Sequence, residues 1–68
     1  MKISARNVLP GTVTSITKGP VSALVTILIA PKVEITATIT ADALGAEAQE
    51  GQVAFALIKA SSVLVGVE

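Results

Sequence analysis

Hydrophobic and polar residues alternate most regularly between Val33 and Thr40. The odd positions are apolar and the even positions polar: Val33, Ile35, Ala37 and Ile39 against Glu34, Thr36, Thr38 and Thr40. Successive side chains of a strand point to opposite faces of a sheet. The pattern therefore predicts a strand with one core face and one face lined by hydroxyl groups.

The stretch from Val21 to Ile29 is apolar on both faces. All its odd positions are apolar, and its even positions include Leu24 and Leu28. A strand of this kind must be covered on both faces. In so short a chain we expect the second cover to come from another subunit. The link Ala30-Pro31-Lys32 is short, so it predicts a hairpin between this strand and Val33–Thr40.

Three further strands complete the pattern. The segments Ile3–Asn7 and Gly11–Thr17, interrupted at Pro10-Gly11, predict a first strand that bends or bulges. Val53–Lys59 and Ser62–Val67 predict the fourth and fifth strands. Closely spaced Gly and Pro residues between Val-, Ile- and Thr-rich runs are typical of a compact all-β domain.

One short helical turn is expected over Ala41–Leu44. Thr40 can cap its start, and Gly45 is placed to end it, with Ala46–Gln49 as an irregular extension. Five strands with one short helix between the third and fourth is the order of an OB-fold-like Greek-key barrel. The expected fold class is thus all-β, although other small barrels have the same order of elements.

The composition indicates a single domain, residues 1–68, that associates with copies of itself. The chain has no cysteine, yet 51% of its residues are hydrophobic and its mean hydropathy is +0.78. A chain of this size buries only about 60% of its unfolded surface. Burying the remaining apolar surface against other copies is the natural outcome.

Several classes of function are disfavoured. The net charge is zero and Phe55 is the single aromatic residue, which argues against a nucleic-acid partner. Without His or Cys a zinc site is not expected, and the scattered carboxylates suggest no acid–base pair, so we expect no enzyme. Apolar runs are far shorter than the ~20 residues of a membrane span, and no leader precedes them. A cytoplasmic protein without a membrane partner is the expectation.

Hydrogen-bond donors are the chain's remaining chemistry. Ser4 and Arg6 share a face if their segment is extended, Lys59 lies close to Ser61, and Lys18 precedes Gly19. Cations beside hydroxyls, without a competing carboxylate, suit a small oxyanion. Each also fits a plainer interpretation: a solvated chain terminus, a strand-end lysine, and a simple turn at Lys18-Gly19-Pro20.

Two segments together resemble a known family. Ser4-Ala5-Arg6-Asn7 near the start and Ile58-Lys59-Ala60-Ser61-Ser62-Val63 near the end are similar to those of the molbindins, or Mop proteins. Intervening matches span the chain: Gly11-Thr12-Val13, Lys18-Gly19-Pro20-Val21, Ile39-Thr40-Ala41 and Glu50-Gly51. Molbindins are small cytoplasmic molybdate-binding proteins, and the same domain is appended to molybdate transport ATPases and molybdate-responsive regulators.

The resemblance implies an OB-like fold, a homo-hexamer built as a trimer of dimers, and molybdate or tungstate bound at subunit interfaces without an organic cofactor. The implied site takes Ser4, Ala5 and Arg6 from one subunit. A neighbour then contributes Thr40, Lys59, Ala60 and Ser61. The turn formed by Lys18, Gly19, Pro20, Val21 and Ser22 is implied as a second site near the three-fold axis. Many relatives carry serine where this chain has Ala43, so one hydroxyl contact is expected to be missing or replaced by an amide.

Two hypotheses of function follow. The first is an oxyanion store or buffer that binds molybdate or tungstate between subunits with no covalent chemistry. The second is an oligomerisation or interaction module of the same fold, in which oxyanion binding is incidental. Elution volume and bound molybdenum on the purified protein distinguish the two.

Overall fold

The computed structural model describes residues 4–44 and 49–68, without the side chains of Ala43 and Leu44. In this part of the chain four strands form one antiparallel sheet in the order β3-β2-β1-β4. The strands are β1 (Asn7–Lys18), β2 (Ser22–Ala30), β3 (Val33–Thr40) and β4 (Val53–Ile58). A helical turn, α1 (Ala41–Leu44), follows β3, and a 3₁₀ turn, η1 (Ala60–Ser62), follows β4.

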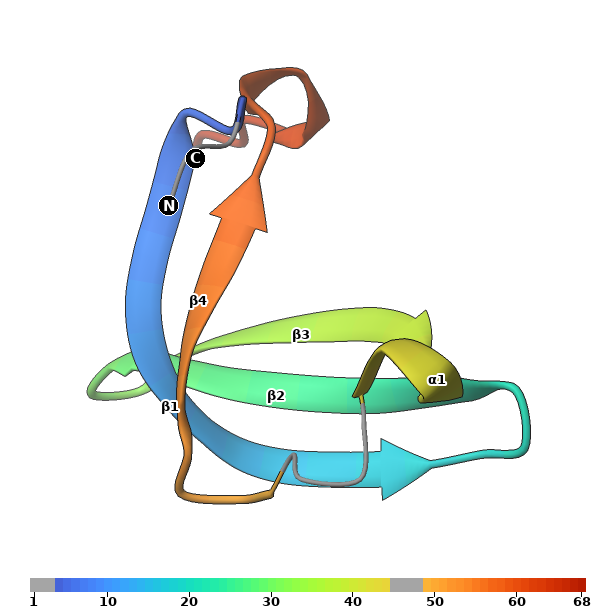
Figure 1. Ribbon diagram of the computed structural model, residues 1–68. Helices are drawn as coiled ribbons and strands as arrows, with labels where there is room; N and C mark the ends of the chain where they lie inside the picture. Colours follow the sequence, from blue (N-terminus) through green and yellow to red (C-terminus); the bar gives the residue numbers. More distant parts are fainter. Residues whose placement is uncertain (1–3, 45–48) are drawn as a thin grey trace.

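The sheet is curled because β1 is long and bends (Figure 1). Its first half pairs with β4, from Asn7 opposite Ile58 to Thr12 opposite Val53. Its second half pairs with β2, from Thr12 opposite Leu28 to Lys18 opposite Ala23. The β1–β4 pair and the β1–β2–β3 part therefore form two arms that meet where β1 changes partner.

Pro10 and Gly11 lie within β1 at that change of partner, and they do not interrupt the strand. Val13 donates to the Gln52 carbonyl (2.9 Å) and accepts from Gly51 (2.8 Å), so the odd residues of β1 face β4. The backbone groups of the even residues, Pro10 among them, therefore face the β2 side. Pairing with β2 begins only at Thr12, so the N–H that proline lacks would have had no strand partner. At Gly11 a Cβ would overlap the Leu28 carbonyl oxygen and lie 2.7 Å from Cγ2 of Ile27. Glycine is required there because β2 crosses so closely.

A β-bulge lies further along β1. The register with β2 shifts between Val13 and Ser15, which leaves Thr14 as the extra residue. The Thr14 hydroxyl lies 3.3 Å from the Thr26 carbonyl oxygen and donates to the Glu34 carboxylate at 3.2 Å. The extra residue places Val13 and Ile16 on the core side although three positions separate them. The expected bulge therefore exists, but nearer the middle of the strand than Pro10-Gly11.

The core is small and lies inside the curl. Among the described residues, those with under a tenth of their surface exposed are Val13, Ala23, Val25, Ile27 and Ala56. The odd side of β2 faces this core, as expected, while Leu24 on its even side is 45% exposed. Full burial of one aliphatic side chain contributes about 1.5–3 kcal/mol to the free energy of unfolding. Because so few side chains are buried, much apolar surface stays exposed to solvent in the described part of the chain.

Strand boundaries follow the sequence closely in the middle of the chain. Val33–Thr40 has the expected bounds, and its hairpin with β2 is confirmed. β2 begins and ends one residue later than expected, and β4 ends one residue earlier, at Ile58. β1 begins at Asn7 because Ser4–Arg6 have no strand partner; Ile3, Gly45 and most of Ala46–Gln49 lie outside the described residues.

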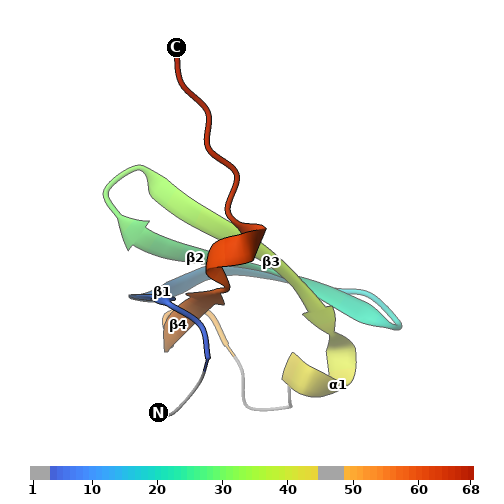
Figure 2. The ribbon, with the colours of Figure 1, turned by 90° about the horizontal axis from the view of Figure 1, so that it is seen from above.

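The expected fifth strand over Ser62–Val67 does not form. Ser62 belongs to η1, and residues 63–68 have no strand structure. Figure 2 shows this tail leading away from the sheet. A strand needs an edge to pair with, and the tail lies along neither β3 nor β4, the two edges of the sheet. The described residues consequently form an open, four-stranded half-barrel.

Candidate functional site

Ser4–Arg6 and Lys59–Ser61 lie at the same end of the sheet. Asn7 pairs with Ile58, so the segment before β1 and the segment after β4 start from one cross-strand pair. The Asn7 side chain strengthens this pair, because its Nδ2 donates to the Ile58 carbonyl at 3.2 Å. In Figure 1 the start of β1 and η1 are correspondingly neighbours at one end of the molecule.

The donors at this end point outward. Ser4 and Arg6 are exposed while Ala5 and Asn7 are half-buried, which is the alternation expected of an extended segment. Lys59 is exposed and extended (φ −65°, ψ 137°) directly before η1. In η1, Ser62 donates to the Lys59 carbonyl at 2.8 Å, whereas the first N–H groups of such a turn have no partner within it. Two cations, hydroxyls and amides thus lie exposed at one end of the β1–β4 pair.

Thr40 lies in the other arm. It pairs with Ser22, and the amide that follows it, of Ala41, donates to the Val21 carbonyl at 2.9 Å. Thr40 therefore belongs with the Lys18–Ser22 turn, which is closed by a 2.8 Å hydrogen bond from Gly19 to the Ser22 carbonyl. In Figure 1 the end of β3 is well separated from η1. One chain does not bring Thr40 to Arg6 and Lys59.

The turn Lys18–Ser22 is exposed throughout, with Val21 75% exposed. Gly19 is crowded, because a Cβ there would lie 3.1 Å from the Ser22 carbonyl oxygen. This turn and Thr40 form a second group of donors, distant from the first. The Ala43 side chain, where a hydroxyl contact was expected to be missing, is outside the described residues.

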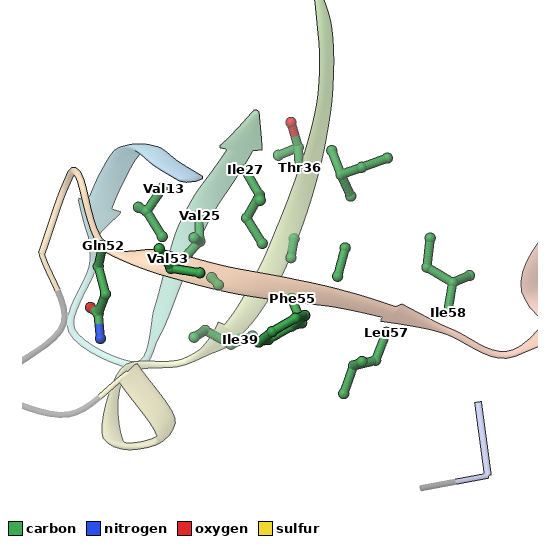
Figure 3. Close-up of a pocket in the computed structure, with 14 residues that line it drawn as sticks. Val13, Val25, Ile27, Thr36, Ile39, Gln52, Val53, Phe55, Leu57 and Ile58 are labelled. Carbon is green, nitrogen blue, oxygen red and sulfur yellow. The ribbon is translucent and has the colours of Figure 1, made fainter. Parts of the chain in front are cut away.

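An apolar groove of about 600 Å³ lies between the two arms. The inner side chains of β2 and β3 line one wall and β4 the other (Figure 3). Its fourteen lining residues carry no charge; only Thr36 and Gln52 are polar. The sequence does not predict this groove, because the expected fifth strand would close the barrel.

The described residues offer little other chemistry. They contain no group of three or more His, Cys, Asp or Glu side chains placed to hold a metal ion. Within the same part of the chain, no helix is long and apolar enough to cross a membrane. The arrangement is suited to holding an anion by charge and hydrogen bonds.

Comparison with known proteins gives the family. The model of the TOBE domain matches residues 3–65. The chain belongs to the TOBE-domain family. This confirms the resemblance to Mop proteins drawn from the residues at both ends of the chain.

Two relatives of this TOBE domain differ greatly in length. The "Probable molybdenum-pterin-binding protein" of Haemophilus influenzae is 46% identical over 69 residues, which cover 100% of both chains. The "Molybdenum transport protein ModE" of Herbaspirillum seropedicae is 44% identical over 66 residues, 96% of this chain but 24% of that protein. The domain thus occurs both as a whole protein and as part of a longer one.

Two solved structures share the fold of this TOBE domain. MopII from Clostridium pasteurianum has a TM-score of 0.87 at 36% identity, over 97% of this chain and 100% of the other. A molybdate binding protein from Sporomusa ovata has a TM-score of 0.89 at 37% identity, over 98% and 100%. The curled antiparallel sheet is the shared feature.

Asn7 is a residue of this TOBE domain that sequence reasoning noticed but gave no role. Its hydrogen bond to the Ile58 carbonyl adds to the backbone pairing from which the two donor segments begin. A carboxamide next to a cationic residue was the available signal. Only the cross-strand register shows which carbonyl it contacts.

Proposed function

We propose that the protein binds molybdate, or the similar oxyanion tungstate, at sites assembled between copies of the chain. The observation that carries the proposal is that the segment Ser4–Arg6 directly precedes, and the segment Lys59–Ser61 directly follows, the Asn7–Ile58 pair at one end of the sheet. The relatives' printed names, which refer to molybdenum and molybdate, support the choice of ion.

The donor set fits a tetrahedral dianion. An oxyanion needs several hydrogen bonds and compensating positive charge, and charge-assisted hydrogen bonds are about twice as strong as neutral ones. Arg6 supplies a planar fork of N–H groups and Lys59 a compact ammonium group. Ser4 and the amides of Ala60–Ser61 supply neutral donors. No covalent step is needed, so the proposed activity is reversible binding.

The site needs more than one chain. Thr40 lies in the other arm of the same chain, so it reaches a site with Arg6 and Lys59 only from another copy. This supports the expectation of interface sites in a homo-hexamer, a trimer of dimers. The second site, at Lys18–Ser22, then has Thr40 as its neighbour. Storage and buffering of the ion in the cytoplasm is the role we propose for such an assembly.

Calorimetric titration with molybdate tests the proposal. Arg6→Ala and Lys59→Ala should each weaken binding about ten- to a hundredfold, the equivalent of losing a hydrogen bond to a charged group, about 1.5–3 kcal/mol. The matched control is Lys32→Gly, which removes an exposed cation from the β2–β3 turn. Binding in the control should be unchanged. Equal affinity in all four proteins would contradict the assigned site.

Mixed assemblies test whether the site is shared between chains. Arg6 and Lys59 belong to one end of a chain and Thr40 would come from another copy, so Arg6→Ala and Thr40→Ala chains each keep the half of the site that the other lacks. Refolding Arg6→Ala and Thr40→Ala chains together should therefore regenerate a fraction of intact sites. If both variants bind weakly and the mixture recovers nothing, Arg6 and Thr40 do not meet between chains.

The alternative is an interaction module of the same fold with incidental oxyanion binding. The uncharged groove between β3 and β4 favours it. Under this alternative, mutation of Arg6 or Lys59 leaves assembly intact, and purified protein carries no molybdenum. Elemental analysis of the purified protein, combined with light scattering, separates the two functions.

A further inference from the structure

We draw no further inference here: the strongest candidate, the exposed apolar patch that Val8 and Pro10 of β1 form with their cross-strand partners Leu57 and Phe55 of β4, carries nothing because nothing in the structure shows what covers it.

Discussion

Asn7 connects the fold to the candidate site. Its backbone belongs to β1, while its side chain donates to the Ile58 carbonyl one residue before Lys59. Ser4 and Arg6 precede it on the exposed side. The Asn7 carboxamide therefore supports the backbone pairing that brings the two cations to one end of the sheet. In the proposed site it would position the ligand-binding groups without contacting the ligand itself.

Asn7→Ala and Asn7→Asp should separate positioning from charge. The alanine variant loses the 3.2 Å hydrogen bond, a contribution of about 0.5–1.5 kcal/mol, and should bind molybdate a few-fold more weakly. The aspartate variant also places a carboxylate between Arg6 and Lys59, so its loss should exceed tenfold. Titration calorimetry measures both. Equal affinities for the two variants would show that a negative charge at position 7 does not weaken molybdate binding.

Gly11 lies where there is no room for a side chain. Its missing Cβ leaves room for the Leu28 carbonyl and for Ile27, 2.7 Å from where a Cβ would stand. Gly11→Ala should lower the free energy of unfolding by about 1–3 kcal/mol, the usual cost of overpacking. The neighbouring control Thr12→Ala, at an exposed position, should change it by less than about 0.5 kcal/mol. Denaturation at one fixed protein concentration makes the comparison. A Gly11→Ala protein as stable as the control would show that β2 can move away.

At the scale of elements, the sequence predicted those strands whose pattern is local. Val33–Thr40 alternates strictly and forms β3 with the expected bounds. Pro10-Gly11 was interpreted as a break, because the same residues mark turns in most sequences. Only the path of β2 shows that they allow a close crossing inside β1. The tail has strand-like composition, but pairing depends on an available edge, which one sequence cannot show.

For the candidate site, too, some features could be predicted from the sequence and others could not. Residue types indicated the donors, and the register of β1 with β4 brings Arg6 to Lys59. Thr40 came only from resemblance to a family of assembled proteins, and in one chain it lies in the other arm. The groove was missed because the expected fifth strand filled it. Sequence therefore indicated the chemistry, while the contacts between chains lie beyond what a single sequence specifies.

The turn of the β2–β3 hairpin contains a residue in an unfavourable backbone conformation. The turn contains Pro31 followed by Lys32, and Lys32 has a left-handed backbone (φ 64°). A non-glycine residue there costs about 1–2 kcal/mol. Lys32→Gly should therefore raise the free energy of unfolding by up to about 1 kcal/mol, and Lys32→Val should lower it. Thermal denaturation of the two variants makes the test. The opposite order would mean that the turn changes type when lysine is removed.

At the scale of the whole molecule, the single chain is incomplete in two respects. Its apolar surface exceeds what its small core covers, with Val53 69% and Val67 91% exposed. Its donors are divided between two arms that do not meet. The proposed association of copies would relieve both conditions, because it would bury the apolar edge and let donors from different copies converge. Folding, assembly and ion binding are therefore expected to be linked, with each stabilising the others by mass action.

An assembly of this kind is expected to release its ion without a pH switch. The chain contains no histidine and no cysteine. None of its side-chain types has an ordinary pKa between 6 and 8. Molybdate affinity should consequently vary by less than about threefold across that range, in contrast to a histidine-based switch. Calorimetric titrations at pH 6, 7 and 8, at one ionic strength, make the measurement.

Salt provides the matching control for the pH series. Charges enclosed between subunits are screened less than those of an exposed patch, for which the screening length is about 8 Å at 0.15 M salt. Raising the salt concentration from about 0.05 to 0.5 M should therefore weaken molybdate binding only a few-fold, provided that assembly is unchanged by light scattering. Release would then follow the free concentration of the ion, as a buffer requires. A tenfold loss between pH 6 and 8 would instead assign a titrating group to the site and contradict the set of donors proposed above.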